Sequence, residues 1–349
     1  MAQSEGLAPH HFLLRQMTGA VAGLVALAVM AELDYRRLRP LAWPLLAITV
    51  LVLAVMVMPG TETLAPRVNG ARRWLYLGPI GVQPSEAAKL VLIVWTAALM
   101  VKKQDRLKSL SRGLLPFLMV WALVALLILA QPNMSTALLA VVLAGLVAYA
   151  GGARPAHFLV LGAVAAPFVW AQVTQVGYRM ARVKAFLDPG ADVADLGYQI
   201  NQSLIALGSG GAVGVGFGRG QQKFGFLPEP HNDFILAMIG EEWGFLGVAS
   251  VVLLFVALAL VGYRVARGAA DLFGFLLAVG VTNLVVVQAF LHMAVNLALV
   301  PPTGVVLPLI SYGRSSMIVT LAAVGILVSV ARTTDRRDRA LAKARGRAL

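Results

Sequence analysis

The sequence of 349 residues contains no cysteine. Disulfides, thiolate metal sites and cysteine nucleophiles are therefore excluded. Charged residues are also scarce, because they make up 13% of the chain against about a quarter of a typical soluble domain. Apolar residues reach 59% and the mean hydropathy is +0.80. This composition excludes a water-soluble globular protein.

The apolar residues form nine blocks with almost no charge, each long enough to cross a hydrocarbon core of roughly 30 Å. We therefore predict an all-α polytopic membrane protein with a single integral membrane domain over residues 1–349. The predicted spans cover residues 12–31, 41–59, 86–101, 114–130, 135–150, 155–174, 234–262, 272–299 and 315–331.

The basic residues predict how the spans are oriented. Most of the 29 Lys and Arg residues lie in one set of short connections and in the tail over residues 332–349, and such segments stay cytoplasmic. The tail has no aromatic residue between its basic residues, which favours an anchor beside anionic lipid headgroups over nucleic-acid binding. The loops over residues 60–85, 175–233 and 300–314 are then outside, and we expect the first two to form the active-site face.

An odd number of spans places the N-terminus outside. Either a short tail is translocated unaided, or a helix upstream of this sequence is missing.

Polar residues collect in the outer loops and beside them, which favours a site at the outer surface over a transport pathway. The first cluster contains Arg72, Arg73 and Trp74. The planar guanidinium of arginine suits a phosphate or pyrophosphate, although an interfacial tryptophan with snorkelling arginines explains the same residues equally well. Glu86 and Lys89 are three residues apart at a predicted helix start, so they are expected to share a face.

The second cluster is the loop over residues 175–233, which is long for a structureless connection and is therefore a candidate working part. Its glycines between residues 208 and 220 lack the GK[ST] of a P-loop. An amide nest for an anion and a flexible loop both remain open, and the flexible loop is the default.

Asp233 ends this loop, where a carboxylate can cap a helix. On an ideal helix Glu241 lies about 80° away and roughly 12 Å deeper, so the two carboxylates are expected to line one cavity. Glu242 lies on the opposite side and needs its own partner or protonation. A third cluster, which includes Ser311 and Tyr312, follows several prolines and glycines, so non-helical backbone is predicted there as a re-entrant segment or a tight turn.

Six segments resemble, in order and with similar spacing, those of the SEDS family (shape, elongation, division and sporulation). The most specific combines Leu227, His231 and Asp233 with Gly240, Glu241 and Glu242. The segments cover residues 69–78, 83–89, 131–137, 198–211, 227–246 and 302–316. Residues 216–218, followed by 222–223, resemble the division branch, FtsW, more than the elongation branch, RodA, which stays the alternative.

The resemblance implies a peptidoglycan glycosyltransferase that polymerises lipid II on the outer face of the cytoplasmic membrane. Nucleic acid is not expected as a partner. It implies a class B penicillin-binding transpeptidase and other division-complex membrane proteins as partners, with enrichment at the division site and a cytoplasmic C-terminus. The family usually has ten helices with a cytoplasmic N-terminus, so this chain is expected to start after the first.

The essential aspartate of the family matches Asp233, which is implied to be the catalytic residue. It would act as general base or as ligand to a divalent cation, Mg²⁺ or Mn²⁺, and no organic cofactor is expected. Glu241 is a further candidate. The implied substrate-binding residues are Arg72, Arg73, Trp74, Glu86, Lys89, Gln202, Glu229, His231, Ser311 and Tyr312.

Two residues depart from the family pattern: Asn133 stands where an aspartate is usual, and Arg314 where a glycine is usual. Two other classes of function stay open. A lipid II flippase is supported by Glu241 and Glu242, and a non-catalytic scaffold that recruits a transpeptidase is suggested by the departures.

Overall fold

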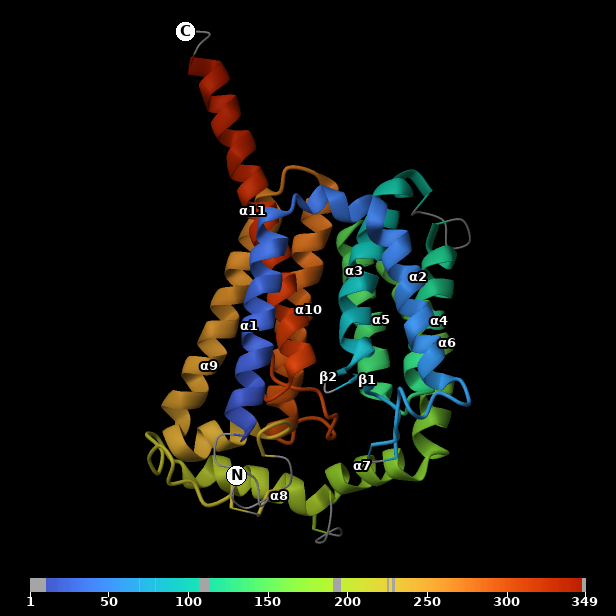
Figure 1. Cartoon of the computed structure of the whole chain (residues 1–349). Helices are drawn as coiled ribbons and strands as arrows, with labels where there is room; N and C mark the ends of the chain where they lie inside the picture. The colour runs from blue at the N-terminus through green and yellow to red at the C-terminus, as the bar shows by residue number, and fades with distance from the viewer. Residues whose placement is uncertain are drawn as a thin grey trace. The chain divides into compact units, whose positions relative to one another are not determined.

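The computed structural model describes residues 11–68, 70–78, 80–106, 113–190, 196–224, 226–227 and 230–346 and is mainly helical (Figure 1). The helices are α1 (His11–Glu32), α2 (Leu38–Val57), α3 (Pro84–Lys102), α4 (Leu115–Leu129), α5 (Met134–Ala150), α6 (Pro155–Thr174), α7 (Gly177–Leu187), α8 (Leu196–Ser209), α9 (Ile235–Gly268), α10 (Leu272–Asn296) and α11 (Arg314–Gly346). Short 3-10 turns cover Tyr35–Arg37 and Gln104–Arg106.

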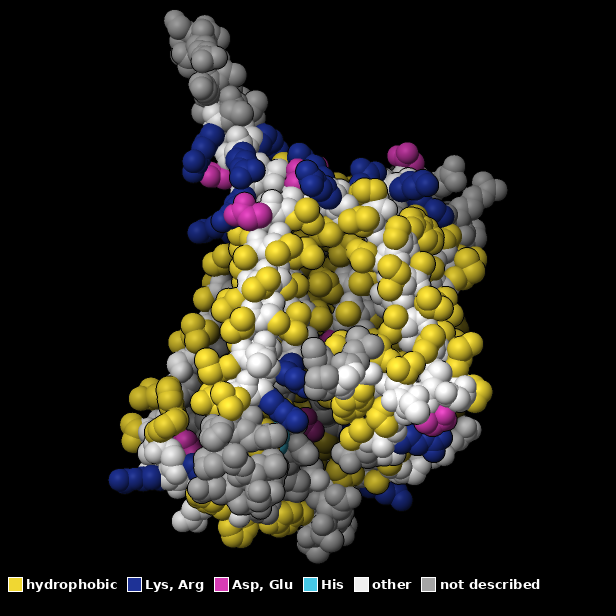
Figure 2. All heavy atoms as spheres, in the orientation of Figure 1, with side chains coloured by type: hydrophobic (Ala, Val, Ile, Leu, Met, Phe, Trp, Pro, Cys, Tyr) yellow, Lys and Arg dark blue, Asp and Glu magenta, His cyan; other side chains and the backbone are white. Residues whose placement is uncertain are grey.

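Each predicted span coincides with one of these helices. Among the described residues, seven helices are long and apolar enough to cross a membrane, and α4 and α5 are shorter apolar helices. The chain is thus a multi-pass membrane protein, as its composition predicts. Many large apolar side chains are exposed on the helix surfaces, which is the pattern expected where lipid replaces water (Figure 2).

The connections over residues 60–85 and 175–233 contain regular secondary structure. Helices α7 and α8 lie within residues 175–233, a segment whose length already argued against a structureless connection. Residues 60–85 contain a hairpin of β1 (Leu75–Leu77) and β2 (Ile80–Val82), in which Tyr76 pairs with Gly81. Both α7 and α8 contain too many polar residues to be recognised by hydropathy.

The chain forms two compact units, which are described separately. The first unit contains the described residues within 1–18, 158–257 and 286–313. The second unit contains those within 19–157, 258–285 and 314–349.

The second unit is built around α3, which packs against α2 and α5. Leu92, Ile93 and Trp95 on α3 are almost completely buried. A Cβ atom on Gly280 of α10 would lie 2.3 Å from Cγ2 of Ile93, so the glycine permits close approach of the helix backbones. Small residues at such contacts are typical of helix packing in lipid, where van der Waals contact replaces the hydrophobic effect.

Lys and Arg side chains gather at the end of the second unit where α11 leaves the other helices (Figure 2). There Asp271 accepts hydrogen bonds from Tyr35 Oη at 2.8 Å, from Arg36 Nε at 2.9 Å and from the Gly274 amide at 2.9 Å. Burial alone would raise the pKa of Asp271, but the Gly274 amide, Arg36 and Tyr35 together hold it below its ordinary value.

Replacing Asp271 by asparagine is therefore expected to lower thermal stability at neutral pH. A carboxyl whose pKa is lowered by folding stabilises the protein above its unfolded-state pKa of about 3.9, and this stabilisation is lost as the pH falls through the folded-state pKa. The effect should stay below about 1 kcal/mol, because a half-exposed Arg36 is screened by solvent. Melting curves from pH 7 to pH 3 check this, and a difference that does not shrink with acid contradicts it.

Helix α9 is broken at Gly244, whose backbone has φ 65° and ψ −161°. The break frees main-chain groups on both sides, and the segment 211–216 of the α8–α9 connection pairs with them. The four hydrogen bonds run from Val215 N to Glu241 O (3.0 Å), from Gly216 N to Glu242 O (3.1 Å), from Phe245 N to Gly211 O (2.8 Å) and from Leu246 N to Ala212 O (3.1 Å). The glycine-rich segment is thus held against α9, and its prediction as a flexible loop is wrong.

Two glycines of this connection should respond differently to alanine. Gly214 and Gly218 both have positive φ, at 83° and 79°. A Cβ on Gly214 would lie 2.2 Å from the Glu242 carbonyl oxygen, whereas a Cβ on Gly218 meets nothing within 4 Å. Gly218→Ala should therefore cost only the left-handed backbone penalty of roughly 1–2 kcal/mol, and Gly214→Ala should cost more. Melting of both variants in detergent tests this, and equal melting temperatures would show that the close contact is unimportant.

Candidate functional site

Asp233 lies just before α9, in the first unit. Its main-chain carbonyl accepts a hydrogen bond from Asn296 Nδ2 at 3.0 Å. Its carboxylate oxygen Oδ2 lies 3.8 Å from the position that a Cβ on Gly304 would occupy. Gly304 has φ +68°, a conformation that glycine adopts without penalty. The carboxylate thus lies against a non-helical turn that joins α10 to α11.

This turn also brings Ser311 and Tyr312 to the segment before α9. Ser311 Oγ donates to the Asn232 carbonyl at 2.8 Å, and the Tyr312 amide donates to the His231 carbonyl at 2.9 Å. The His231 ring lies 4.5 Å from the Phe12 ring and 5.5 Å from the Tyr312 ring, measured between centroids. Three residues predicted from two separate motifs, His231, Ser311 and Tyr312, therefore lie together beside Asp233. Non-helical backbone is confirmed over residues 301–313.

The helical geometry that related Glu241 to Asp233 does not apply to the structure. Asp233 lies outside the helix, so its position cannot be projected onto Glu241 with helical geometry. The Glu241 carboxylate is 3% exposed and accepts from the amides of Gln221 (2.7 Å) and Gln222 (3.3 Å). It therefore fastens the α8–α9 connection to α9.

Glu242 has the separate partner that its position requires. Its carboxylate pairs with Lys223 Nζ at 2.6 Å and accepts from the Gly218 amide at 2.9 Å. The amide groups of this connection thus bind carboxylates of the protein itself rather than an external anion. With Glu241 engaged as well, the two residues no longer support a polar transport pathway.

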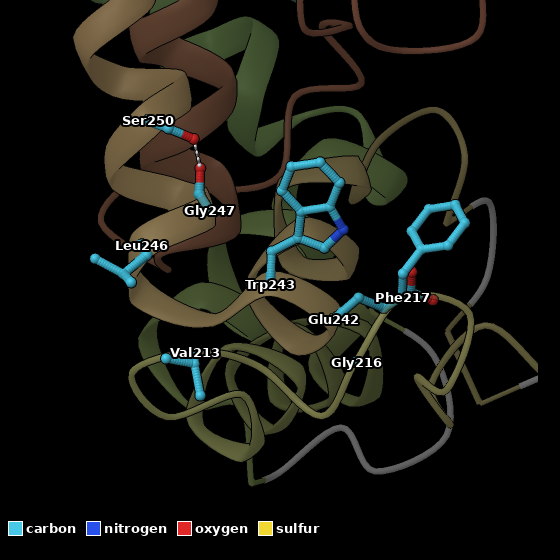
Figure 3. A pocket seen from close by; sticks show the side chains of 8 residues that line it. All are labelled: Val213, Gly216, Phe217, Glu242, Trp243, Leu246, Gly247 and Ser250. Carbon is cyan, nitrogen blue, oxygen red and sulfur yellow. Dashed lines mark hydrogen bonds between the residues drawn. The ribbon is translucent and has the colours of Figure 1, made fainter.

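A groove of about 370 Å³ opens beside the break in α9 (Figure 3). Phe217 and Trp243 flank it with their rings 6.4 Å apart, and Ser250 Oγ donates to the Gly247 carbonyl at 2.7 Å. None of the predicted substrate-binding residues that the structure describes lines this groove.

The arginine–tryptophan cluster belongs to the second unit, just before β1. Arg72 pairs with Glu62 and donates to the Met58 carbonyl at 3.1 Å. Hydrogen bonds from the backbone amide of Glu62 and from Arg72 hold the pKa of the Glu62 carboxyl below its ordinary value. Arg73 donates to the Pro132 carbonyl, and Trp74 is half-buried. Both guanidinium groups are thus held in place by other groups of the protein.

Glu86 and Lys89 form the ion pair that their spacing predicts, in the first turns of α3. Lys89 Nζ lies 2.8 Å from Glu86 Oε1, and the exposed fractions of the two side chains are 1% and 9%. Pro84 is the first residue of α3, as expected for a residue without an amide hydrogen. The pair is buried, which distinguishes it from an ordinary surface salt bridge.

The structure places both departures from the family pattern at the start of a helix. Asn133 precedes α5 and its Oδ1 accepts from the Thr136 amide at 3.4 Å, a capping role that asparagine and aspartate share. Arg314 is the first residue of α11, and a Cβ on Gly19 of α1 would lie 3.0 Å from its Cα. Of the other predicted residues, Gln202 is half-buried on α8, and Glu229 lies outside the described residues.

The described residues contain no group of three or more His, Asp or Glu side chains that could hold a metal ion. The protein residues around Asp233 alone therefore do not form a resident metal site, and a cation there would need oxygen atoms from the substrate. The divalent cation remains a prediction.

Asn296 binds the Asp233 carbonyl and Gly304 faces the Asp233 carboxylate, but neither was recognised as a site residue in the sequence. The available signal was a polar residue every four positions, at Gln288, His292 and Asn296, within an otherwise apolar helix.

Comparisons with known proteins agree with this arrangement. The FtsW/RodA/SpoVE family model, described as "Cell cycle protein", matches residues 1–336. The chain is 42% identical over 320 residues to the probable peptidoglycan glycosyltransferase FtsW of Geobacter sulfurreducens, covering 92% of this chain and 85% of the relative. It is 37% identical over 321 residues to the stage V sporulation protein E of Bacillus subtilis, covering 92% and 87%.

Two solved structures share the fold. One, described as "Structural coordination of polymerization and crosslinking by a peptidoglycan synthase complex", matches with TM-score 0.78 and 29% identity over 93% of this chain and 91% of that chain. The rod shape determining protein RodA of Thermus thermophilus matches with TM-score 0.67 and 28% identity over 94% and 90%. The chain therefore belongs to the FtsW/RodA/SpoVE family, the SEDS family that its motifs indicate.

Proposed function

We propose that the chain is a peptidoglycan glycosyltransferase that polymerises lipid II into glycan strands at the outer face of the cytoplasmic membrane. Its relatives carry the name of this activity. The observation that carries the proposal is the placement of Asp233. Its carboxylate faces Gly304, and its main-chain carbonyl is bound by Asn296 of the same unit.

Asp233 is the general base in this proposal. Glycosyl transfer needs the 4-hydroxyl of one sugar to lose its proton as its oxygen attacks the anomeric carbon of the donor, while the donor's bond to pyrophosphate breaks. Asp233 would take the proton, and a positioned base contributes about 10²–10⁴ in rate. The donor is α-linked and the glycan is β-linked, so the reaction inverts the anomeric carbon.

The family resemblance assigns stabilisation of the leaving pyrophosphate to cationic side chains. Arg73 and Arg72 are held by carbonyl groups and, for Arg72, by Glu62, which leaves a planar fork oriented in advance. The positive charge of Lys89 is largely neutralised by its ion pair with Glu86, so Lys89 would contribute less to stabilising the pyrophosphate. His231, Ser311 and Tyr312 would hold the sugar side of the substrate near Asp233.

The partner in this proposal is a class B penicillin-binding transpeptidase, with the other membrane proteins of the division complex. A structurally similar protein belongs to a complex that coordinates polymerisation and crosslinking. The FtsW names of the relatives reported above support a septal role with enrichment at the division site. The basic residues of the tail over residues 332–349 support a cytoplasmic C-terminus.

The test uses proteoliposomes that contain the purified chain, its transpeptidase partner and labelled lipid II, with and without EDTA. Glycan strands on a gel are expected. Transfer of label across the membrane without strands would favour a flippase, and partner binding with neither activity would favour a scaffold. If EDTA abolishes strand formation and Mg²⁺ or Mn²⁺ restores it, a divalent cation that binds together with the substrate is supported.

A further inference from the structure

Helix α10 carries a row of three buried polar side chains, Gln288, His292 and Asn296. Residues four positions apart on a helix lie about 40° apart around its axis, so the three share one face. Their exposed fractions are 2%, 1% and 0%. Polar groups buried in an apolar helix are costly unless each is hydrogen-bonded, so their partners indicate their purpose.

All three side chains bind main-chain atoms of the segments that meet at Asp233. Gln288 Nε2 donates to the Val306 carbonyl at 3.1 Å, and His292 Nδ1 donates to the Val305 carbonyl at 2.8 Å. These carbonyls follow directly after Gly304, against which the Asp233 carboxylate lies. The first two members of the row thus hold the turn on one side of the carboxylate.

Asn296 holds the other side. Its Nδ2 donates to the Asp233 carbonyl and to the His292 carbonyl, each at 3.0 Å, and its Oδ1 accepts from the Ala237 amide at 3.1 Å. Its own carbonyl accepts from Ser203 Oγ of α8 at 2.9 Å. The Ala237 amide is among the first amides of α9, which have no partner within the helix. One side chain therefore joins the start of α9, the backbone of Asp233 and α10.

We infer that Asn296 is a positioning residue that sets the direction of the Asp233 carboxylate, with Gln288 and His292 fixing the surface against which it lies. The inference rests on the proposed function, in which Asp233 is the general base. Displacement of a reacting group by about 1 Å can cost roughly a hundredfold in rate. Loss of the Asn296 amide leaves the Asp233 carbonyl and the Ala237 amide without this partner, so the segment can shift.

The experiment compares Asn296→Ala with Asn283→Ala in the complex with the transpeptidase. Asn283 is a matched control on the same helix, because it is also buried and its side chain accepts from Tyr263 Oη and donates to the Val279 carbonyl, both at 2.9 Å. It belongs to the second unit and not to the unit of Asp233. Asn296→Asp is a second variant, which keeps the acceptor for the Ala237 amide and loses the donor to Asp233.

Asn296→Ala should lower kcat for lipid II polymerisation by roughly ten- to a hundredfold, with KM within about twofold of the wild type. Asn283→Ala should leave both constants nearly unchanged even where it lowers the melting temperature. If Asn296→Ala does not fold, Asn296→Asp should still show the same fall in kcat.

An Asn296 variant with wild-type kcat, a loss no larger than that of Asn283→Ala, or a change confined to KM would overturn the inference. If Asp233→Ala abolishes polymerisation and Asn296→Ala leaves it unchanged, only the positioning role is refuted. Wild-type protein that makes no strands refutes the proposed function first, so the two failures are distinguishable.

Discussion

Asp233→Asn is expected to lower kcat for lipid II polymerisation by at least about a hundredfold, because the amide cannot accept the proton of the attacking hydroxyl. The substitution keeps the size of the side chain and its place beside Gly304. Expression, melting temperature and binding of the transpeptidase should therefore stay near wild-type values. Initial rates of strand formation on labelled lipid II provide the measurement.

Asp188→Asn is the control for this substitution. Asp188 also belongs to the first unit but is exposed, at the end of α7. Its replacement should leave the rate of polymerisation within about twofold of the wild type, as expected for a surface substitution away from the site. Equal losses for the two variants would mean that charge in this unit matters in general and that Asp233 has no special role.

The second large effect concerns stability. Lys89→Met is expected to lower the free energy of unfolding by about 3–5 kcal/mol, because it leaves the Glu86 carboxylate buried without its cation. The double variant Glu86→Gln with Lys89→Met removes both charges and should lose less. Unfolding by SDS in mixed micelles gives the free energies.

Arg339→Met provides the matched comparison on α11. Arg339 pairs with Asp335 at 2.7 Å, but the exposed fractions of the two side chains are 80% and 60%. An exposed pair of this kind contributes about 0.5 kcal/mol or less. If Lys89→Met destabilises the protein no more than Arg339→Met does, burial of the ion pair has no energetic importance.

The spans could be predicted from the sequence because each depends on a local property, a run of apolar residues long enough to cross lipid. Pro84 was sufficient to predict the start of α3, and the spacing of Glu86 and Lys89 was sufficient to predict that they share a face. The residues around Asp233 were found through motifs, and the structure brings His231 and Ser311 to it through backbone hydrogen bonds.

The parts that could not be predicted depend on contacts between distant segments. Gly244 in an apolar run looks like an ordinary helical residue, and only the pairing with residues 211–216 shows why α9 breaks there. The argument for a cavity shared by Asp233 and Glu241 used helical geometry, which does not apply because α9 begins after Asp233. Asn296 could not be assigned, since its partners lie 59 and 63 positions away in the sequence.

The most direct test of the account is the formation of the first glycosidic bond under single-turnover conditions. The transpeptidase partner is acylated with a β-lactam, and two molecules of lipid II are joined by the wild type or by Asp233→Asn. The account predicts that both proteins bind lipid II with similar affinity and that only the wild type forms the lipid-linked tetrasaccharide. Formation of the tetrasaccharide by Asp233→Asn at the wild-type rate would contradict it.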